Sequence, residues 1–309
     1  MTYYMVGDLI RDARERQNYS QEELSYGICT TSTLSRIENG VQIPGKRVLE
    51  GLLQRLGLVD MVSCAYFGKE ELERCEIKQQ LTLSLGHGEY GKAEMLAAKM
   101  EEKLRGMPRK DFSIKMEEQY VRFAWALIRK HRGEKMERVL ELLLETIRMT
   151  IPDFDGLHIK RRLLTFHEIS ILNSIGCAYH RMGRLWDGMR LLLQLKEYME
   201  GHNVQGQAIP VKYTMVLQNL SSWMGQEGYY QDALCLCQTG IDYCIKHGKL
   251  HTFPMLLFNK ACALAELGQY EMSKEYFSQS AIIFQATKRQ ENAEQIRSYA
   301  ARHYGMKSL

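Results

Sequence analysis

A glycine recurs along most of this 309-residue chain, each time within a similar local pattern. The five glycines are Gly88, Gly133, Gly183, Gly228 and Gly268, at intervals of 45, 50, 45 and 40 residues. A large or aromatic residue usually stands two positions later. A small residue often stands five positions later, as at Ala93, Gly188, Ala233 and Ser273, with Arg138 as the exception. A fixed period of this length indicates a repeat architecture, in which each unit buries its apolar face against the next.

The segments on both sides of each glycine have the composition of helices. Around Gly183, for example, residues 172–182 and 185–193 are rich in Leu, Met and Ala and contain no proline. A glycine between two such segments ends the first helix in a left-handed conformation. The small residue then allows the second helix to pack closely on the first. We therefore predict five helical hairpins over about residues 70–285, closed by a polar amphipathic capping helix over 290–302.

These hairpins resemble the tetratricopeptide repeat, whose units carry a glycine and an aromatic residue at this turn and a small residue inside the second helix. The intervals depart from the family, because its repeat has about 34 residues. The resemblance implies a right-handed superhelix of about five tetratricopeptide-like hairpins.

The first turn, Gly-His-Gly-Glu-Tyr-Gly at residues 86–91, also matches the dinucleotide-binding pattern G-x-G-x-x-G. That pattern is meaningful only where a strand precedes it within a βαβ unit. Residues 73–85 are instead rich in Glu, Lys, Gln and Leu, with Ile77, Leu81 and Leu85 four positions apart, which predicts a helix. We therefore expect no nucleotide cofactor.

The composition favours an all-α protein, because prolines number only five and helix-forming residues are abundant. No apolar run is as long as a membrane span and no secretion signal is evident, so a cytoplasmic location without membrane association is expected. The eight cysteines have no C-x-x-C spacing and no paired histidines. We interpret them as reduced, mostly buried thiols, and we expect no metal.

The glycine period does not extend into the first 68 residues, so we divide the chain into domains at 1–68 and 69–309. Helices are predicted over 6–16, 20–28, 31–38 and 46–56. Ser20 with Glu23 forms a capping box at the start of the second helix, and Asn39-Gly40 ends the third.

The stretch S-Q-E-E-L-S-Y-G-I-C-T-T-S-T-L-S-R-I-E-N-G at 20–40 resembles the helix-turn-helix of the Cro and phage-repressor family, over about residues 6–58. The family usually has glycine in the turn, where this chain has Cys29, with Gly27 placed earlier. The resemblance implies binding to double-stranded operator DNA, with the helix at 31–38 in the major groove.

The resemblance assigns a role to each polar residue of this motif. Thr31, Ser32 and Ser35 are expected to contact bases, Arg36 a base or a phosphate, and Gln21, Lys46 and Arg47 the DNA backbone. Thr30 or Thr31 is expected to be the N-cap. The alternative is that Thr31 and Ser32 are only capping hydroxyls. Arg14 and Glu38 match a family pair that ties the first helix to the end of the third.

The head has no net positive charge. Residues 1–68 contain seven Lys and Arg against eight Asp and Glu, so no strong overall field attracts DNA. We therefore expect binding by a homodimer.

Taken together, a Cro-like head followed by helical hairpins resembles the peptide-pheromone receptors of Gram-positive quorum sensing, of the Rgg, PlcR and PrgX type. The resemblance implies that a short signalling peptide binds the concave face of the repeats. Candidate peptide contacts are three inner-helix asparagines and their neighbours: Asn173, Asn219, Asn259, Gln218, Lys260 and Tyr179. A carboxamide offers a donor and an acceptor to a peptide backbone. The alternatives are a solvated helix face for the asparagines and core packing for the tyrosine.

Two other classes of function were weighed. An enzyme is disfavoured, because no G-x-S-x-G, H-E-x-x-H or phosphate-loop pattern occurs, and we assign no catalytic residue. The second is a helix-turn-helix regulator whose repeats bind another protein and no peptide.

Overall fold

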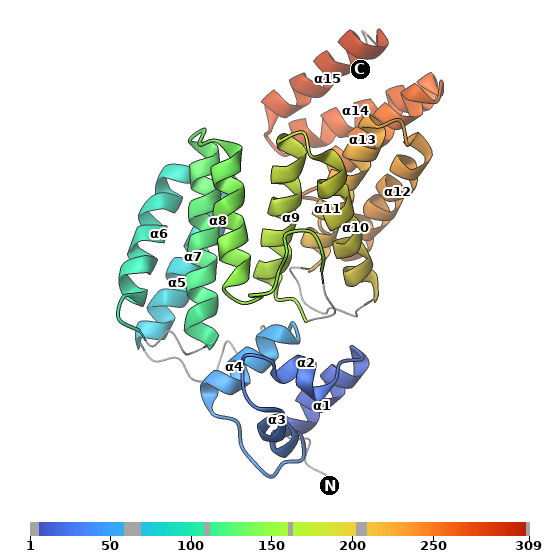
Figure 1. Ribbon diagram of the computed structural model, residues 1–309. Coiled ribbons are helices and arrows are strands. Elements are labelled where there is room, and N and C mark those ends of the chain that lie inside the picture. Colours follow the sequence, from blue (N-terminus) through green and yellow to red (C-terminus); the bar gives the residue numbers. More distant parts are fainter. Residues whose placement is uncertain (1–5, 59–68, 108–111, 160–162, 202–208, 307–309) are drawn as a thin grey trace. The chain divides into compact units, whose positions relative to one another are not determined.

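The computed structural model describes residues 6–58, 69–107, 112–159, 163–201 and 209–306, and within these ranges every regular element is a helix (Figure 1). The predicted all-α class is therefore confirmed. The chain forms two compact units, residues 1–206 and 207–309. The domain boundary predicted at residue 68 falls among residues 59–68, which lie outside the described ranges.

Four helices form the head at the start of the first unit. They are α1 (Val6–Arg16), α2 (Gln21–Ser25), α3 (Thr31–Glu38) and α4 (Lys46–Arg55). Their apolar positions meet in one core, built around Ile10, Leu24, Leu34, Ile37 and Leu52. The predicted bounds of α1 and α3 are confirmed, and Ser20 with Glu23 forms the predicted capping box. The head therefore has a core of its own that fixes the direction in which α3 faces.

Gly7 allows α1 to lie against the backbone of α3. A Cβ atom at this position would lie 2.1 Å from the carbonyl oxygen of Ile37. Only glycine permits so close an approach without a shift of one helix. The position of α3 therefore depends on the absence of a side chain here.

The second helix is shorter than predicted. We expected it to continue to Ile28, but it ends at Ser25, with Tyr26 as its C-cap. Gly27 has a φ of +73°, which is the left-handed conformation. The chain therefore turns at Gly27, two positions before Cys29, because only glycine adopts this conformation without steric cost.

The remaining helices form the repeats. In the first unit the hairpins pair α5 (Lys69–His87) with α6 (Tyr90–Leu104), α7 (Phe112–His131) with α8 (Met136–Arg148), and α9 (Phe166–Arg181) with α10 (Leu185–Gly201). In the second unit they pair α11 (Ile209–Gln226) with α12 (Tyr230–His247), and α13 (Phe253–Glu266) with α14 (Tyr270–Ala286). The five predicted hairpins are therefore confirmed.

Each hairpin turns at its predicted glycine. Gly88, Gly133, Gly183, Gly228 and Gly268 have φ values of 77°, 81°, 76°, 82° and 76°. The next residue donates its N–H to a carbonyl one turn back, as Gln269 does to Leu264 at 2.9 Å. This bond and the left-handed residue are the features of a Schellman motif. The stretch at 86–91 is thus a turn between two helices, without a strand before it.

The small residues after the turns are buried where the two helices of a hairpin meet. Ala93, Ala233 and Ser273 are fully buried, and Gly188 is buried as well. In the second hairpin Arg138 is exposed, and the next residue, Val139, is buried in place of a small one. The departure of this unit from the pattern is therefore accommodated by a shift of one residue.

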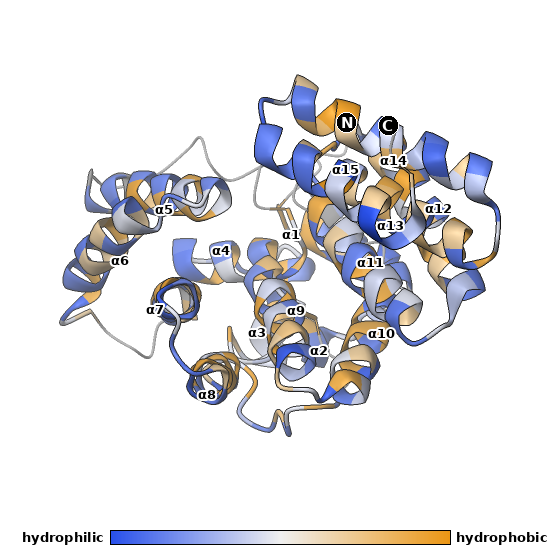
Figure 2. Cartoon of the chain, turned by 90° about the horizontal axis from the view of Figure 1, so that it is seen from above, coloured by the Kyte–Doolittle hydropathy of each residue, from blue (hydrophilic) through white to orange (hydrophobic). Residues whose placement is uncertain are grey.

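Helix α15 (Gln290–Tyr304) closes the second unit as the predicted cap. Its buried residues, Ala293, Ile296 and Ala300, join a core that includes Phe277 and Phe284 of α14. Its other faces are largely hydrophilic, as the colouring in Figure 2 shows. The turn before it repeats the hairpin turn with Lys288, at a φ of +60°, in the place of glycine.

A long connection leads from α8 to α9 and is fixed in place along its described parts. The side chain of Gln194 donates to the carbonyl of Leu157 at 2.9 Å and accepts from the N–H of Ile159 at 3.0 Å. Further along, Leu163 is buried in the core of the head. The N–H of Leu164 donates to the hydroxyl of Tyr198 at 2.8 Å. This connection thus contributes to the core of the first domain as well as to the repeats.

The cysteines of the described residues carry no disulfide bond. Cys237 is buried while Cys235, two positions earlier on the same helix, is exposed. No helix in the described parts of the chain combines the length and the apolar character that a membrane span requires.

Candidate nucleic-acid interface

Helix α3 presents one face to the core and a polar face to solvent. Leu34, Ile37 and Glu38 are buried beneath it. The residues predicted to contact bases lie on the other side: Thr31, Ser32 and Arg36 are exposed, and Ser35 is half-buried. The structure therefore brings these four predicted residues together on one surface.

Thr30 is the N-cap of α3. Its Oγ1 accepts the N–H of Thr33 at 3.1 Å and lies 2.9 Å from the hydroxyl of Ser32. This leaves Thr31 outside the cap, with its hydroxyl 3.4 Å from that of Ser25. The capping alternative thus applies to Thr30, while Thr31 and Ser32 present exposed hydroxyl groups at the start of the helix.

A buried carboxylate connects α1, α2 and α3. Glu38, which is only 1 % exposed, accepts from Nε and Nη2 of Arg14 at 2.6 and 2.9 Å. The hydrogen bond with Glu38 raises the pKa of Arg14, so the pair is ionised. Arg14 also donates to the carbonyl of Tyr19 at 2.8 Å. The predicted pairing of Arg14 with Glu38 is therefore confirmed.

Gln21 is a third partner of this carboxylate. Its Nε2 donates to Oε2 of Glu38 at 2.7 Å. A carboxamide nitrogen carries two hydrogens, so one N–H is fixed by Glu38 and the other can meet a phosphate. Glu38 thus orients Gln21 as well as anchoring α3.

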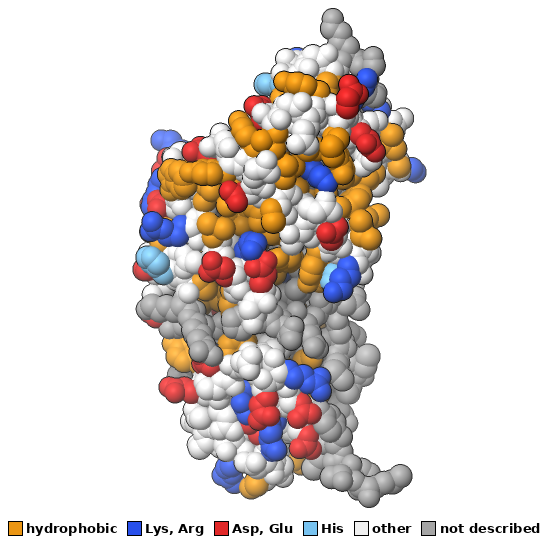
Figure 3. Space-filling model, turned by 90° about the vertical axis from the view of Figure 1, so that its right-hand side faces the viewer, with side chains coloured by type: hydrophobic (Ala, Val, Ile, Leu, Met, Phe, Trp, Pro, Cys, Tyr) orange, Lys and Arg blue, Asp and Glu red, His pale blue; other side chains and the backbone are white. Residues whose placement is uncertain are grey.

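The start of α4 provides a second set of groups suited to phosphate. Lys46 is half-buried, Arg47 is exposed, and the N-cap Gly45 supplies no side-chain bond to the helix. Amide groups at a helix N-terminus favour an anion. Elsewhere on the head acidic and basic side chains alternate, as on the face drawn at the bottom of Figure 3. Any attraction for DNA is therefore local to α3 and the start of α4.

Two residues of this interface were not predicted from the sequence. Arg11 donates to the carbonyl oxygen of Glu38 and, at 3.1 Å, to Oδ1 of Asn39. Arg11 stands one helical turn before Arg14 on α1, and this spacing is the signal that could have identified it. Both arginines thus hold the C-terminal end of α3.

A further contact unpredicted from the sequence ties the head to the repeats of the same unit. The hydroxyl groups of Tyr19 and Tyr198 lie 3.3 Å apart and are buried. Burial raises the pKa of Tyr198 to about 12. Because these residues are far apart in the chain, local patterns contain no signal for their pairing.

The candidate peptide residues of the second unit lie on α11 and α13. Nδ2 of Asn259 donates to the carbonyl of Gln218 at 2.9 Å and to the hydroxyl of Ser221 at 3.0 Å. Both amide hydrogens are thus engaged within the fold, and only Oδ1 remains for a ligand. Asn219, on α11, is half-buried.

Lys260 faces another direction. It donates to Gln238 of α12 at 2.6 Å and to Tyr276 of α14 at 2.9 Å. The predicted grouping of Lys260 with Asn259 on one surface is wrong, because adjacent residues of a helix are about 100° apart.

In the first unit the candidates are Asn173 and Tyr179, and both are buried. The hydroxyl of Tyr179 donates to the carbonyl of Gly156 at 3.0 Å. Tyr179 therefore anchors the long connection, and its prediction as a peptide contact is wrong for that reason. Asn173 stands ten positions before its turn glycine, whereas Asn219 stands nine before its own, so the two do not occupy the same repeat position.

Comparison with known proteins gives first a class of domain and then solved relatives. Residues 10–62 match the helix-turn-helix family model, of which residues 10–58 are described. No curated protein sequence matches the chain.

Two solved structures are similar to nearly the whole chain. PlcR of Bacillus thuringiensis, in complex with the peptide PapR7 and DNA, is 16% identical with a TM-score of 0.64, covering 95% of this chain and 99% of its own. ComR from S. thermophilus, in complex with DNA and its signalling peptide ComS, is 16% identical with a TM-score of 0.51, covering 95% and 98%. At this identity the likeness concerns the fold: a helix-turn-helix head followed by helical repeats.

Proposed function

We propose that this chain is a cytoplasmic transcriptional regulator that binds operator DNA as a homodimer and responds to a short signalling peptide bound by its repeats. The observation that carries the proposal is the exposed polar face of α3 on a matched helix-turn-helix head. The repeats that follow give the same architecture as a protein solved with a peptide and DNA. The proposal assigns the chain no catalytic residue.

On DNA, α3 would enter the major groove with its N-terminal end toward the base edges. The exposed hydroxyls of Thr31 and Ser32 can donate to or accept from bases, and Arg36 can donate to guanine or to a phosphate. Gln21, Lys46 and Arg47 would contact phosphates on either side of this helix. Because the head has no net positive charge, two heads on an inverted repeat would supply the affinity that one lacks.

In the repeats, an extended peptide needs partners for its backbone groups, because each amide buried without one costs about 1–3 kcal/mol. Asn219 is the strongest candidate, since it is half-buried on an inner helix. Asn259 could contribute its Oδ1, while Asn173 is more deeply buried. Gln218 lies beside Asn219 and is half-buried as well. These residues form the proposed peptide contact, without Lys260 and Tyr179.

A gel shift on the DNA upstream of the chain's own gene tests the first part. The double substitution Thr31→Ala and Ser32→Ala should weaken binding to the operator by roughly 5- to 150-fold and leave binding to random DNA unchanged. Gln21→Ala should weaken binding to both DNAs alike, because phosphates carry no sequence information. Equal losses on both DNAs for the hydroxyl variant would contradict the assignment of α3 to base contact.

The peptide is tested by repeating the gel shift with and without spent culture medium and with its oligopeptide fraction. The medium should change operator binding by the wild-type chain, and Asn219→Ala should weaken this response about tenfold or more. Lys274→Ala, at an exposed position of α14, serves as the control. A response that survives removal of oligopeptides, or no response at all, would reject a peptide ligand and favour repeats that bind another protein.

A further inference from the structure

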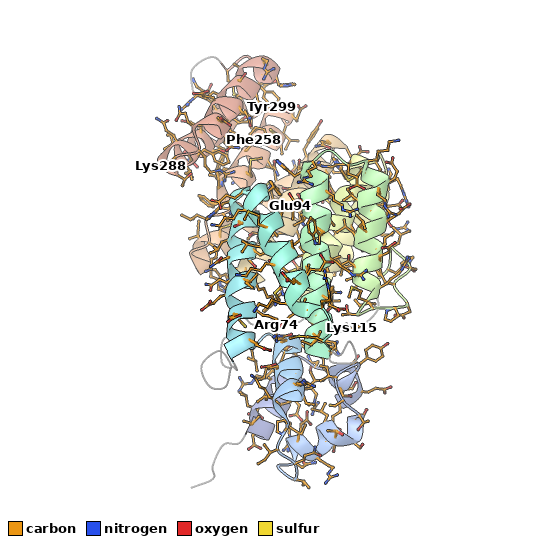
Figure 4. All side chains as sticks on the ribbon, turned by 90° about the vertical axis from the view of Figure 1, so that its left-hand side faces the viewer. Arg74, Glu94, Lys115, Phe258, Lys288 and Tyr299 are labelled. Carbon is orange, nitrogen blue, oxygen red and sulfur yellow. The ribbon has the colours of Figure 1, made fainter. Side chains whose placement is uncertain are left out.

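The first unit has a groove on the side of α6, α7 and α8. Two adjoining cavities of about 190 and 330 Å³ share Glu101 of α6 and Arg122 and Trp125 of α7. The first is also lined by Arg105 and Glu118, and the second by Arg129, Leu142 and Glu145. The three helices are seen end-on in Figure 2 and with their side chains in Figure 4. Trp125 lies, half-buried, between the cavities.

The repeat register places this groove on the side of the second helices. Trp125 stands eight positions before its turn glycine, as does Lys260. Lys260 contacts α12 and α14, the second helices of the two hairpins of its unit. The walls of the Trp125 groove are likewise the second helices of adjacent hairpins, α6 and α8. The groove is therefore separate from the inner-helix position of Asn219.

The charges of the groove balance. Three arginines (Arg105, Arg122 and Arg129) line it together with three glutamates (Glu101, Glu118 and Glu145). Within the described ranges, Arg105, Arg122 and Glu101 form no ion pair, and all three are exposed. A surface of this kind has no net attraction for nucleic acid or for an acidic partner.

We propose that a second copy of this chain docks on this groove, with Trp125 near a two-fold axis. In a two-fold interface each patch meets its own copy, so a patch that carries both signs in equal number can pair every charge with the opposite charge of its partner. Arg122 and Glu101 border both cavities beside Trp125, so the two-fold arrangement pairs Arg122 of one copy with Glu101 of the other, twice. A half-buried tryptophan with flanking arginines is also typical of the centre of an interface.

The size of this face sets the strength of the dimer. The 15 residues of α6 span about 22 Å, and three adjacent helices span about 20 Å. The face therefore measures on the order of 450 Å² on each copy, near the lower limit for a specific interface. The dimer should be weak in solution and should depend on protein concentration. The inference rests on the homodimer of the proposed function and assigns it a surface.

Sedimentation velocity of the full chain without DNA, over a series of concentrations, tests this surface. Arg122→Glu and Glu101→Arg should each weaken dimerisation at least tenfold, because each brings two like-charged pairs together. An equimolar mixture of the two variants should dimerise again, since the altered charges then face opposite ones. Lys274→Glu makes the same change of charge at an exposed position of α14 and should leave the dimer unchanged. Unaltered melting temperatures would show that the variants fold.

A mixture that stays monomeric, or single variants that dimerise like the wild type, would overturn the proposal. A gel shift on the same variants separates this failure from that of the proposed function. Operator binding by variants whose dimer is unaffected would reject the groove and retain the regulator.

Discussion

Glu38 allows the sharpest test of how the head holds its DNA-facing helix. The substitution Glu38→Ala removes two hydrogen bonds from Arg14 and one from Gln21, at 2.6 to 2.9 Å. It leaves a buried guanidinium with only the carbonyl of Tyr19 and the exposed Glu15 as partners. Breaking a buried ion pair in this way costs about 3–5 kcal/mol. A domain as small as this head has a stability of about the same size, so the variant head should be largely unfolded.

Hydrogen exchange measured by mass spectrometry reports on the head directly, because all three tryptophans of the chain lie in the repeats. Amides of α1 and α3 should exchange at least about 100-fold faster in Glu38→Ala, which corresponds to a loss of about 3 kcal/mol. Glu15→Ala is the matched control, since Glu15 contacts the same arginine from an exposed position; it should cost under about 1 kcal/mol. Replacing both partners, as Arg14→Met with Glu38→Leu, should recover most of the protection. Equal exchange in the Glu38 and Glu15 variants would refute the argument.

Three further substitutions test the packing of the helices. Gly7→Ala should destabilise the head by about 1–3 kcal/mol, because its Cβ would lie 2.1 Å from a carbonyl oxygen of α3; unchanged exchange in α1 and α3 would contradict this contact. Lys288→Gly should stabilise the second unit by about 1 kcal/mol by relieving a left-handed conformation, as measured by denaturant unfolding followed through the buried Trp223. In the same assay Asn259→Ala should cost about 1–3 kcal/mol, since it breaks the bonds to Gln218 and Ser221; a loss below about 0.5 kcal/mol would show that the bonds contribute little.

The elements that the sequence predicts well are those fixed by local chemistry. Each hairpin turn requires a left-handed residue, and glycine marks that position in all five cases. The capping box at Ser20 and Glu23 is likewise a local pattern with one physical interpretation. The end of α2 was missed although Gly27 is visible in the sequence. The family pattern places the turn at Cys29, and that expectation outweighed the conformational preference of the glycine.

The candidate site was predicted in part, for a related reason. The exposed face of α3 follows from its apolar spacing, because Leu34 and Ile37 determine which side is buried. For the repeats, spacing locates a residue along a helix but does not show which neighbouring helix it faces. Lys260 and Asn259 are adjacent in the chain and contact different helices. Tyr179 was misassigned because its partner, Gly156, lies in a connection whose course has no local signal.

The position of Leu163 in the core of the head has a consequence for the synthesis of the chain. The helices of the head end at Arg55, yet the core that they form is completed by a residue more than 100 positions later. At translation rates of about 5–20 residues per second, Leu163 follows the head by roughly 5–20 s. During this interval the nascent head exposes the apolar site that Leu163 later fills. The DNA-binding domain should therefore reach its full stability only after the first two hairpins have been made.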